Sequence, residues 1–292
     1  MSGTEKVVGR AREVELLVAA LDCGAHVLLE GPPGTGKTTL LRAVAEESKT
    51  SFVFVEGNAE LTPARLVGHF DPAQVLERGY GPATFVDGPL AEALRAGALL
   101  YVEEANRIPE ETLNVLVTVM SEGELHVPRL GRIVAADGFR LVAAMNPFDS
   151  VGTARIASAI YDRVCRITMG YQDAADETAI VELRAPKVPA GWRGKVVELV
   201  RRTRDHPDIR IGSSVRGAID MTKLAAALAA RRDRSVTDYR VGLDASLVAL
   251  SGRIRLREAG TRDAEMVITE LYQSVFGRGD SHDEDGDASG GA

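Results

Sequence analysis

The sequence is poor in the residues that mark secreted or metal-binding proteins. Of its 292 residues, two are cysteine and five are histidine. Cys23 and Cys165 lie far apart in the chain and lack the spacing of a metal-binding pair, and the scattered histidines suggest no zinc site. We therefore predict that both cysteines are small buried core residues in a protein of a reducing compartment.

Long apolar runs are missing as well. The longest is well short of the roughly 18 residues that a membrane span needs. Residues 1–6 lack the charged-then-apolar layout of a signal peptide. Hydrophobic residues make up 45% of the chain and aromatic residues only 5%, which indicates a globular protein with an aliphatic core. These features predict a soluble, cytoplasmic protein without a membrane span.

The chain has no excess of basic residues. It holds 35 basic and 42 acidic residues, a formal net charge of −7. Five of the acids lie in segment 280–292, which has no Lys or Arg, so the rest of the chain carries a charge of only −2. A near-neutral body argues against a dedicated nucleic-acid binder. Segment 280–292 is rich in Gly, Asp and Ser, and we expect a disordered acidic tail that aids solubility rather than docking.

A phosphate-binding loop is present. Residues 31–38, Gly-Pro-Pro-Gly-Thr-Gly-Lys-Thr, fit the pattern G-x-x-x-x-G-K-[S/T] at every fixed position. An apolar run at 25–30 predicts a strand before the loop, and apolar spacing over 37–48 predicts a helix after it. Backbone N–H groups of such a turn and helix start surround phosphate oxygens. We expect Lys37 to reach the β- and γ-phosphates and the Thr38 hydroxyl to ligate Mg²⁺.

A second motif places two acids after an apolar strand. Residues 99–102 are apolar and are followed by Glu103 and Glu104. We expect Glu103 to hold the Mg²⁺ shell and Glu104 to polarise the attacking water as a general base. Glu103 is one methylene longer than the aspartate usual there, which bears on Mg²⁺ affinity and turnover. Asn146 ends the next strand, where its amide could orient the water or form an ordinary Asn-Pro turn.

Strands and helices alternate in the first part of the chain, which predicts a parallel α/β sheet. The predicted strands are 25–30, 51–55, 98–104, 139–145 and 164–168. The helices are 12–21, 37–48, 63–67, 89–96 and 110–122. Residues 68–89 look like an insertion with a small hairpin at 83–87, and a second hairpin pairs 124–128 with 132–135.

The pattern changes near residue 185. Pro186, Pro189 and Gly191 indicate a linker, and only helices are predicted beyond it, at 192–203, 213–232, 243–256 and 263–276. We therefore predict an α/β nucleotide-binding domain (1–185), a small all-helical domain (186–279) and the tail (280–292).

Together these motifs resemble an AAA+ ATPase, and within that superfamily the MoxR family. The segments that carry the resemblance are 7–10, 26–38, 85–89, 103–107, 145–147, 161–163 and 212–216. The resemblance implies an AAA+ P-loop domain with a five-stranded parallel sheet, a small helical lid domain, and ATP and Mg²⁺ as cofactors.

The resemblance also implies roles for single residues. Asn146 resembles the sensor-1 residue, and Arg163 the arginine finger that reaches the nucleotide of a neighbouring subunit, with Arg155 as the alternative. Arg216 resembles the sensor-2 arginine, which acts on the nucleotide of its own subunit. Arg163 could instead be a salt-bridged surface residue and Arg216 an ordinary helix N-terminal arginine. The implied nucleotide contacts are Val8, Gly9, Gly31, Pro32, Pro33, Gly34, Thr35, Gly36, Lys37, Thr38 and Thr39.

Members of the MoxR family are chaperone-like ATPases that form rings, usually hexamers, and assemble or activate partner proteins, often metalloenzymes. They commonly act with a protein that carries a von Willebrand factor A domain, so the resemblance implies such a partner and a client protein. Tyr80 is a weak candidate for a pore-loop aromatic residue, which favours remodelling by domain motion over threading. The alternatives are a subunit of a magnesium or cobalt chelatase, a nucleic-acid motor, and a nucleotide-gated scaffold that hydrolyses weakly.

Overall fold

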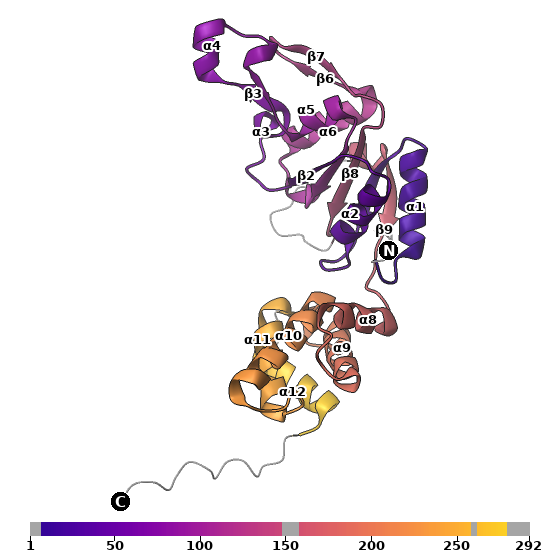
Figure 1. Cartoon of the computed structure of the whole chain (residues 1–292), viewed down its shortest axis with the longest axis vertical. Coiled ribbons are helices and arrows are strands. Elements are labelled where there is room, and N and C mark those ends of the chain that lie inside the picture. Colours follow the sequence, from indigo (N-terminus) through magenta and orange to yellow (C-terminus); the bar gives the residue numbers. More distant parts are fainter. Residues whose placement is uncertain (1–6, 148–157, 258–261, 279–292) are drawn as a thin grey trace, which may run out of the picture. The chain divides into compact units, whose positions relative to one another are not determined.

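The computed structural model describes residues 7–147, 158–257 and 262–278. The chain divides into two compact units, Met1–Tyr171 and Gln172–Ala292 (Figure 1). The tail expected at 280–292 and the alternative finger Arg155 lie outside the described residues.

The first unit is built on a five-stranded sheet in the order β2-β5-β8-β1-β9, and each neighbouring pair is parallel. Its strands are β1 (His26–Glu30), β2 (Phe52–Glu56), β5 (Leu99–Glu103), β8 (Arg140–Met145) and β9 (Val164–Thr168). The central strands are nearly continuous apolar runs because helices cover both faces of the sheet. This confirms the predicted parallel α/β sheet.

Alternate residues of each strand enter two separate cores. Val27 and Leu29 of β1 pack with the residues of α1 and α2, whereas Leu28 packs with those of α3, α5 and α6. Side chains of a strand point to opposite faces in turn, so one strand contributes to both layers of helices. These helices are α1 (Ala11–Asp22), α2 (Lys37–Glu47), α3 (Pro63–Val67), α5 (Pro89–Ala96) and α6 (Glu110–Glu122).

The insertion differs from its prediction. Its ladder joins β3 (Gly68–Phe70) to β4 (Phe85–Asp87), with α4 (Pro72–Arg78) and the 3₁₀ turn η2 (Pro82–Thr84) between them. No hairpin forms within 83–87 alone, because those few residues cannot both turn and pair. The helix begins where the Asp71 carboxylate accepts N–H bonds from Ala73 and Gln74.

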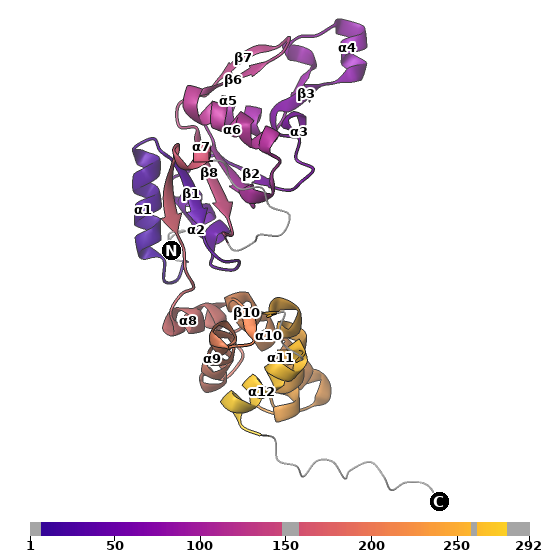
Figure 2. The same cartoon turned by 180° about the vertical axis from the view of Figure 1, so that it is seen from behind.

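The second hairpin forms as predicted, between β6 (Glu124–Val127) and β7 (Gly131–Val134). It lies beside the insertion at one end of the first unit (Figure 2). The Arg129 guanidinium lies 4.0 Å from the ring centroid of Tyr80, so the two segments are in contact.

The second unit is helical, with one short addition. Its helices are α8 (Ala174–Arg184), α9 (Ala190–Asp205), α10 (Val215–Arg232), α11 (Tyr239–Leu250) and α12 (Ala264–Phe276). A two-stranded antiparallel ladder, β10 (Ile209–Ile211) with β11 (Arg255–Leu256), is added to the predicted bundle.

The boundary between the units lies at residues 171 and 172, not at 185 and 186 as predicted. Helix α8 belongs to the second unit because Val181 is fully buried in that unit's core. The proline-rich segment after α8 is therefore a connection within the helical unit and not the linker before it.

The prediction for the cysteines was wrong, since both are exposed. Cys23 follows the last residue of α1, and Cys165 faces outward from β9, which is an edge strand. Among the described helices, none combines the length and the hydrophobicity that a bilayer crossing requires.

The central strands should dominate the stability of the first unit. Leu141 of β8 is 1% exposed and Leu76 of α4 is 90% exposed. Leu141→Ala should lower the free energy of unfolding by about 2–5 kcal/mol, whereas Leu76→Ala should change it by less than about 0.5 kcal/mol. Urea denaturation followed by circular dichroism measures both, and equal losses would contradict the assigned core. The single tryptophan, Trp192, lies in the second unit, so its fluorescence reports separately on that unit.

Candidate functional site

The phosphate-binding loop connects β1 to α2, as predicted. Gly34 and Gly36 have φ values of 78° and 89°, a left-handed conformation that favours glycine. Lys37 is only 9% exposed, and its Nζ donates hydrogen bonds to the carbonyl oxygens of Gly31 (2.8 Å) and Pro32 (3.0 Å). The ammonium group is therefore held against the loop itself.

The start of the loop is packed between the ends of two strands. The Gly31 N–H donates to the Met145 carbonyl of β8 at 3.2 Å, and the Met169 N–H donates to the Glu30 carbonyl at 2.7 Å. A Cβ atom on Gly31 would lie 2.1 Å from the Met169 carbonyl oxygen. Only glycine allows this approach, so Gly31 sets where the loop leaves the sheet.

Thr38 and Glu103 meet, although they are 65 residues apart. The Thr38 hydroxyl donates to Glu103 Oε1 at 2.8 Å. It also lies 3.3 Å from the Tyr101 hydroxyl. Burial raises the pKa of Tyr101 well above its ordinary value, so that hydroxyl keeps its proton.

This pair of oxygen donors fits Mg²⁺, which takes one or two protein oxygen ligands together with substrate phosphates. The described residues contain no group of three or more His, Cys, Asp or Glu arranged for a metal ion. The donor set therefore suits a nucleotide-bound cation better than a cation held in an all-protein cage.

Glu104 adopts an unusual backbone conformation. Its φ of 52° and ψ of 41° lie in the left-handed region, which is uncommon outside glycine and often marks functional positions. The residue starts the 3₁₀ turn η3 (Ala105–Arg107), and its carboxylate pairs with Arg107 at 3.0 Å. Both side chains are more than 40% exposed, so this ion pair holds the carboxylate only weakly.

Asn146 follows β8, the neighbour of β5. Its carbonyl accepts a hydrogen bond of 3.4 Å from the side chain of Asn106, which is buried in η3. The strands β5, β8 and β1 are adjacent and parallel, so their carboxyl ends lie at one edge of the sheet. The structure thus brings the loop, the two acids and Asn146 together.

Arg163 lies elsewhere. It follows α7 (Ser158–Tyr161) and immediately precedes β9, at the amino edge of the sheet (Figure 2). Its guanidinium donates to the Ser121 hydroxyl near the end of α6 and, at 2.8 Å, to the Ala159 carbonyl. The length of a five-residue strand, roughly 16 Å, separates this edge from the edge with the loop.

The remaining predicted residues are spread over both units. Val8 is half-buried and Gly9 is exposed with a φ of 68°, just before α1. Arg216 is an exposed residue in the first turn of α10 in the second unit. Within the loop Thr35 is buried, whereas Pro33 and Thr39 are exposed.

Arg10 was not predicted as a site residue. It is 4% exposed, and its guanidinium donates to the carbonyl oxygens of Thr35 (3.0 Å) and Gly170 (2.5 Å). It also pairs with Glu13 at 2.7 Å. Arg10 therefore joins the loop, α1 and the segment after β9, a role that its place in the motif at 7–10 could only suggest.

Glu30 was also missed, because the sequence shows it only as the last residue of an apolar strand. It is 6% exposed, accepts a hydrogen bond of 2.7 Å from the Tyr161 hydroxyl and pairs with Arg166 at 3.3 Å. Burial and the bond to Glu30 raise the pKa of Tyr161 to about 12, so the phenol stays a donor. This contact joins the residue before the loop to the short helix before Arg163.

Comparisons with known proteins identify the same class of protein as these motifs. The family described as AAA domain (dynein-related subfamily) matches residues 26–164. Gas vesicle ATPase GvpN1 of Halobacterium salinarum is 31% identical, over 82% of this chain and 73% of that protein. The chain is an AAA+ ATPase of the MoxR family.

Two further comparisons support this family assignment and the AAA+ fold. The uncharacterised protein YeaC of Bacillus subtilis is 28% identical, over 92% of this chain and 90% of that protein. The solved structure of the RuvB Holliday junction branch migration motor of Thermotoga maritima has a TM-score of 0.55 and 18% identity, over 85% of this chain and 72% of that chain. The second likeness concerns the AAA+ fold alone.

The packing of Gly31 predicts a selective loss of nucleotide binding. Gly31→Ala should weaken ATP binding at least about tenfold, because the added methyl group would displace the loop from Met169. Gly170→Ala is the matched control, since a Cβ atom there meets no atom within 4 Å. Titration with a fluorescent ATP analogue measures both affinities. Equal affinities for the two variants would show that the loop tolerates the displacement.

Proposed function

We propose that this AAA+ ATPase works as a ring that uses ATP hydrolysis to remodel, assemble or activate a partner protein. The observation that carries the proposal is the division of the site between the two edges of the sheet. Loop, acids and Asn146 lie at the carboxyl edge, and Arg163 lies at the amino edge. This division supports the proposal that Arg163 serves a nucleotide on a neighbouring subunit and not the one on its own loop.

In this proposal each subunit binds ATP at its own loop. The loop N–H groups and Lys37 hold the phosphates, and Glu104 accepts a proton from the attacking water while Asn146 orients it. Thr38 and Glu103 would hold Mg²⁺, which offsets the charge on the phosphate oxygens when bound. Their contact of 2.8 Å supports this role, because it shows that the longer glutamate side chain at position 103 still lies beside the Thr38 hydroxyl.

Two arginines complete the proposed site. Arg163 of a neighbouring subunit stabilises the charge that develops on the transferred phosphoryl group. Arg216 of the second unit acts on the nucleotide of its own subunit. A positive residue in the first turn of a helix opposes the helix dipole, so the place of Arg216 is not explained by helix stability.

The insertion and the hairpin are the proposed route by which motion of the helical unit reaches a client. The Tyr80 ring packs against Phe70 of β3 and the Arg129 guanidinium of the hairpin, so it joins these two segments. This arrangement supports remodelling by domain motion over threading past a free pore loop. A protein with a von Willebrand factor A domain is the proposed partner, on the strength of the MoxR resemblance.

A nucleotide-gated scaffold with slow hydrolysis is the second candidate, and the pairing of Glu104 with Arg107 favours it. A Glu104 carboxylate that stays paired with the Arg107 guanidinium is less able to accept a proton from the attacking water.

The role of Glu104 predicts a catalytic defect without a binding defect. Glu104→Gln should lower kcat about 10²- to 10⁴-fold, because the amide cannot accept the proton from water. ATP affinity should stay within about twofold, since the residue does not hold the phosphates. Steady-state kinetics and nucleotide titration measure the two effects. Glu110→Gln, an equal charge change at an exposed residue of α6, is the control. An unchanged kcat in Glu104→Gln would favour the scaffold.

A finger supplied by a neighbour predicts recovery of activity in mixtures. Arg163→Ala and Glu104→Gln should each be nearly inactive alone. Mixed subunits should regain activity, because Glu104→Gln subunits supply an intact Arg163 to nucleotide sites of Arg163→Ala subunits that keep Glu104. The ATPase rate as a function of the mixing ratio measures this recovery.

The control mixture pairs Arg163→Ala with the double variant Glu104→Gln/Arg163→Ala, which has no finger to donate and should stay inactive. Full activity of Arg163→Ala alone, at any protein concentration, would exclude the finger in trans.

A further inference from the structure

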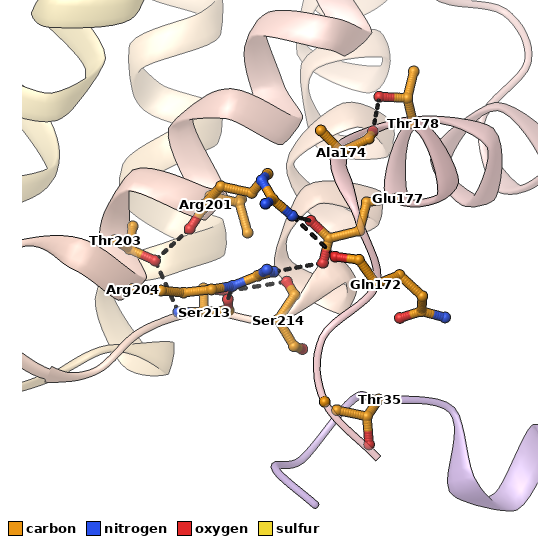
Figure 3. A network of polar contacts seen from close by, with 12 residues as sticks. Thr35, Gln172, Ala174, Glu177, Thr178, Arg201, Thr203, Arg204, Ser213 and Ser214 are labelled. Carbon is orange, nitrogen blue, oxygen red and sulfur yellow. Dashed lines mark hydrogen bonds and ion pairs between the residues drawn. The ribbon is translucent and has the colours of Figure 1, made fainter. Parts of the chain in front are cut away.

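A buried carboxylate joins two helices of the second unit. Glu177 of α8 is 1% exposed and lies between two arginines of α9 (Figure 3). Its Oε1 accepts from Arg204 at 2.7 Å and its Oε2 from Arg201 at 3.3 Å. Such a network seldom stabilises a fold more than apolar residues would, but loss of one partner leaves a buried charge uncompensated, so the contacts of Glu177 are costly to break.

Arg204 and the neighbouring Thr203 connect this network to the segment before α10. Arg204 Nε donates to the Ser213 carbonyl at 2.8 Å, and the Ser213 N–H donates to the Thr203 hydroxyl at 2.9 Å. Both backbone groups of Ser213 are thus bound by adjacent residues of α9. Thr203 is 0% and Ser213 1% exposed, so water does not compete for these bonds.

The glycines around Ser213 leave the segment little freedom to move. A Cβ atom on Gly212 would lie 2.7 Å from the Arg204 Cα atom, and one on Gly217 would lie 2.2 Å from the Ser213 hydroxyl oxygen. Gly212 is therefore packed directly on the backbone of α9, and Gly217, in the first turn of α10, is packed against Ser213.

The same network binds the first residue of the unit. Arg201, which contacts Glu177, also donates to the Gln172 carbonyl at 2.9 Å. Gln172 follows the boundary between the two units. The carboxylate of Glu177 therefore links the start of the helical unit to the segment that leads into Arg216.

Arg216 lies three residues after Ser213. We propose that Glu177, Thr203 and Arg204 are positioning residues that fix Arg216 in the orientation needed for ATP hydrolysis. This inference rests on the role of Arg216 proposed above. The three residues act through Ser213 and do not touch the substrate.

Thr203 allows a sharp test, because one hydroxyl group can be removed without a change of shape. Thr203→Val should lower kcat about tenfold or more, since a small misplacement of a catalytic group has large effects. The KM for ATP should change less than about twofold. Thr203→Ser, which keeps the hydroxyl, should retain most of the activity.

Glu177→Gln and Glu182→Gln form a matched pair of charge changes on α8. Glu182 pairs with Arg193 at 2.7 Å, near the other end of α9 from Arg201 and Arg204. Glu177→Gln should lower kcat as Thr203→Val does, and Glu182→Gln should not.

A double-mutant cycle separates positioning from general damage. In an Arg216→Ala background, Thr203→Val should cause no further loss of kcat if Thr203 acts through Arg216. An equal loss in both backgrounds would overturn the proposal. A fall in kcat for Arg216→Ala, with Thr203→Val and Glu177→Gln at wild-type levels, would overturn it too while leaving the proposed function intact.

Hydrogen exchange of the 292-residue chain tests, without ATP, whether the network holds segment 212–217 in place. Peptides covering 212–217 should exchange faster in Thr203→Val and Glu177→Gln than in wild type. Their exchange rate in Glu182→Gln should equal that of the wild type. Unchanged exchange in the first two variants would refute the network's control of this segment. Wild-type kcat in Arg216→Ala would instead remove the proposed role of Arg216, whatever the exchange data show.

Discussion

The parallel arrangement of β1, β5 and β8 is the constraint on which the nucleotide site depends. Their carboxyl ends lie at one edge of the sheet, and each strand delivers one part of the chemistry there. The hydrogen bond between the Thr38 hydroxyl and Glu103 is the direct consequence, since it joins the helix after the loop to the acid at the end of β5. A strand order in which β5 was not near β1 would separate the cation ligands.

Each unit also contains a buried carboxylate that joins segments of that same unit. In the first unit Glu30 binds Tyr161 and Arg166, which ties the strand before the loop to the short helix before Arg163. In the second unit Glu177 binds Arg201 and Arg204, which ties α8 to the segment before Arg216. In each unit the carboxylate therefore binds residues close to an arginine that is proposed to act in catalysis. Such contacts cost desolvation energy, and breaking them would leave a buried charge without its partner.

Much of the fold could be predicted because local signals agreed with the tertiary structure. Helices α3, α5 and α6 begin and end as predicted, with a proline at or just before the first residue and apolar residues at helical spacing. Helix α8 was not predicted and the domain boundary was misplaced. The buried residues of α8 include the charged Glu177, so the helix lacks a clear apolar periodicity. Its membership in the second unit depends on Val181 and Glu177, whose partners lie on other helices. The exposure of Cys165 likewise depends on β9 being an edge strand, which no local pattern reveals.

The sequence alone predicts the phosphate-binding loop, the pair of acids and the alternation of strands and helices. These features are local, because glycine conformation, residue spacing and apolar periodicity act within a few neighbouring residues. The folded chain was needed to show that Thr38 meets Glu103 and that Arg163 lies at the opposite edge of the sheet. It also showed that three charged residues are buried in polar networks: Arg10, Glu30 and Glu177. Such contacts join residues far apart in the chain, and they form only when strand order and helix packing bring their side chains together.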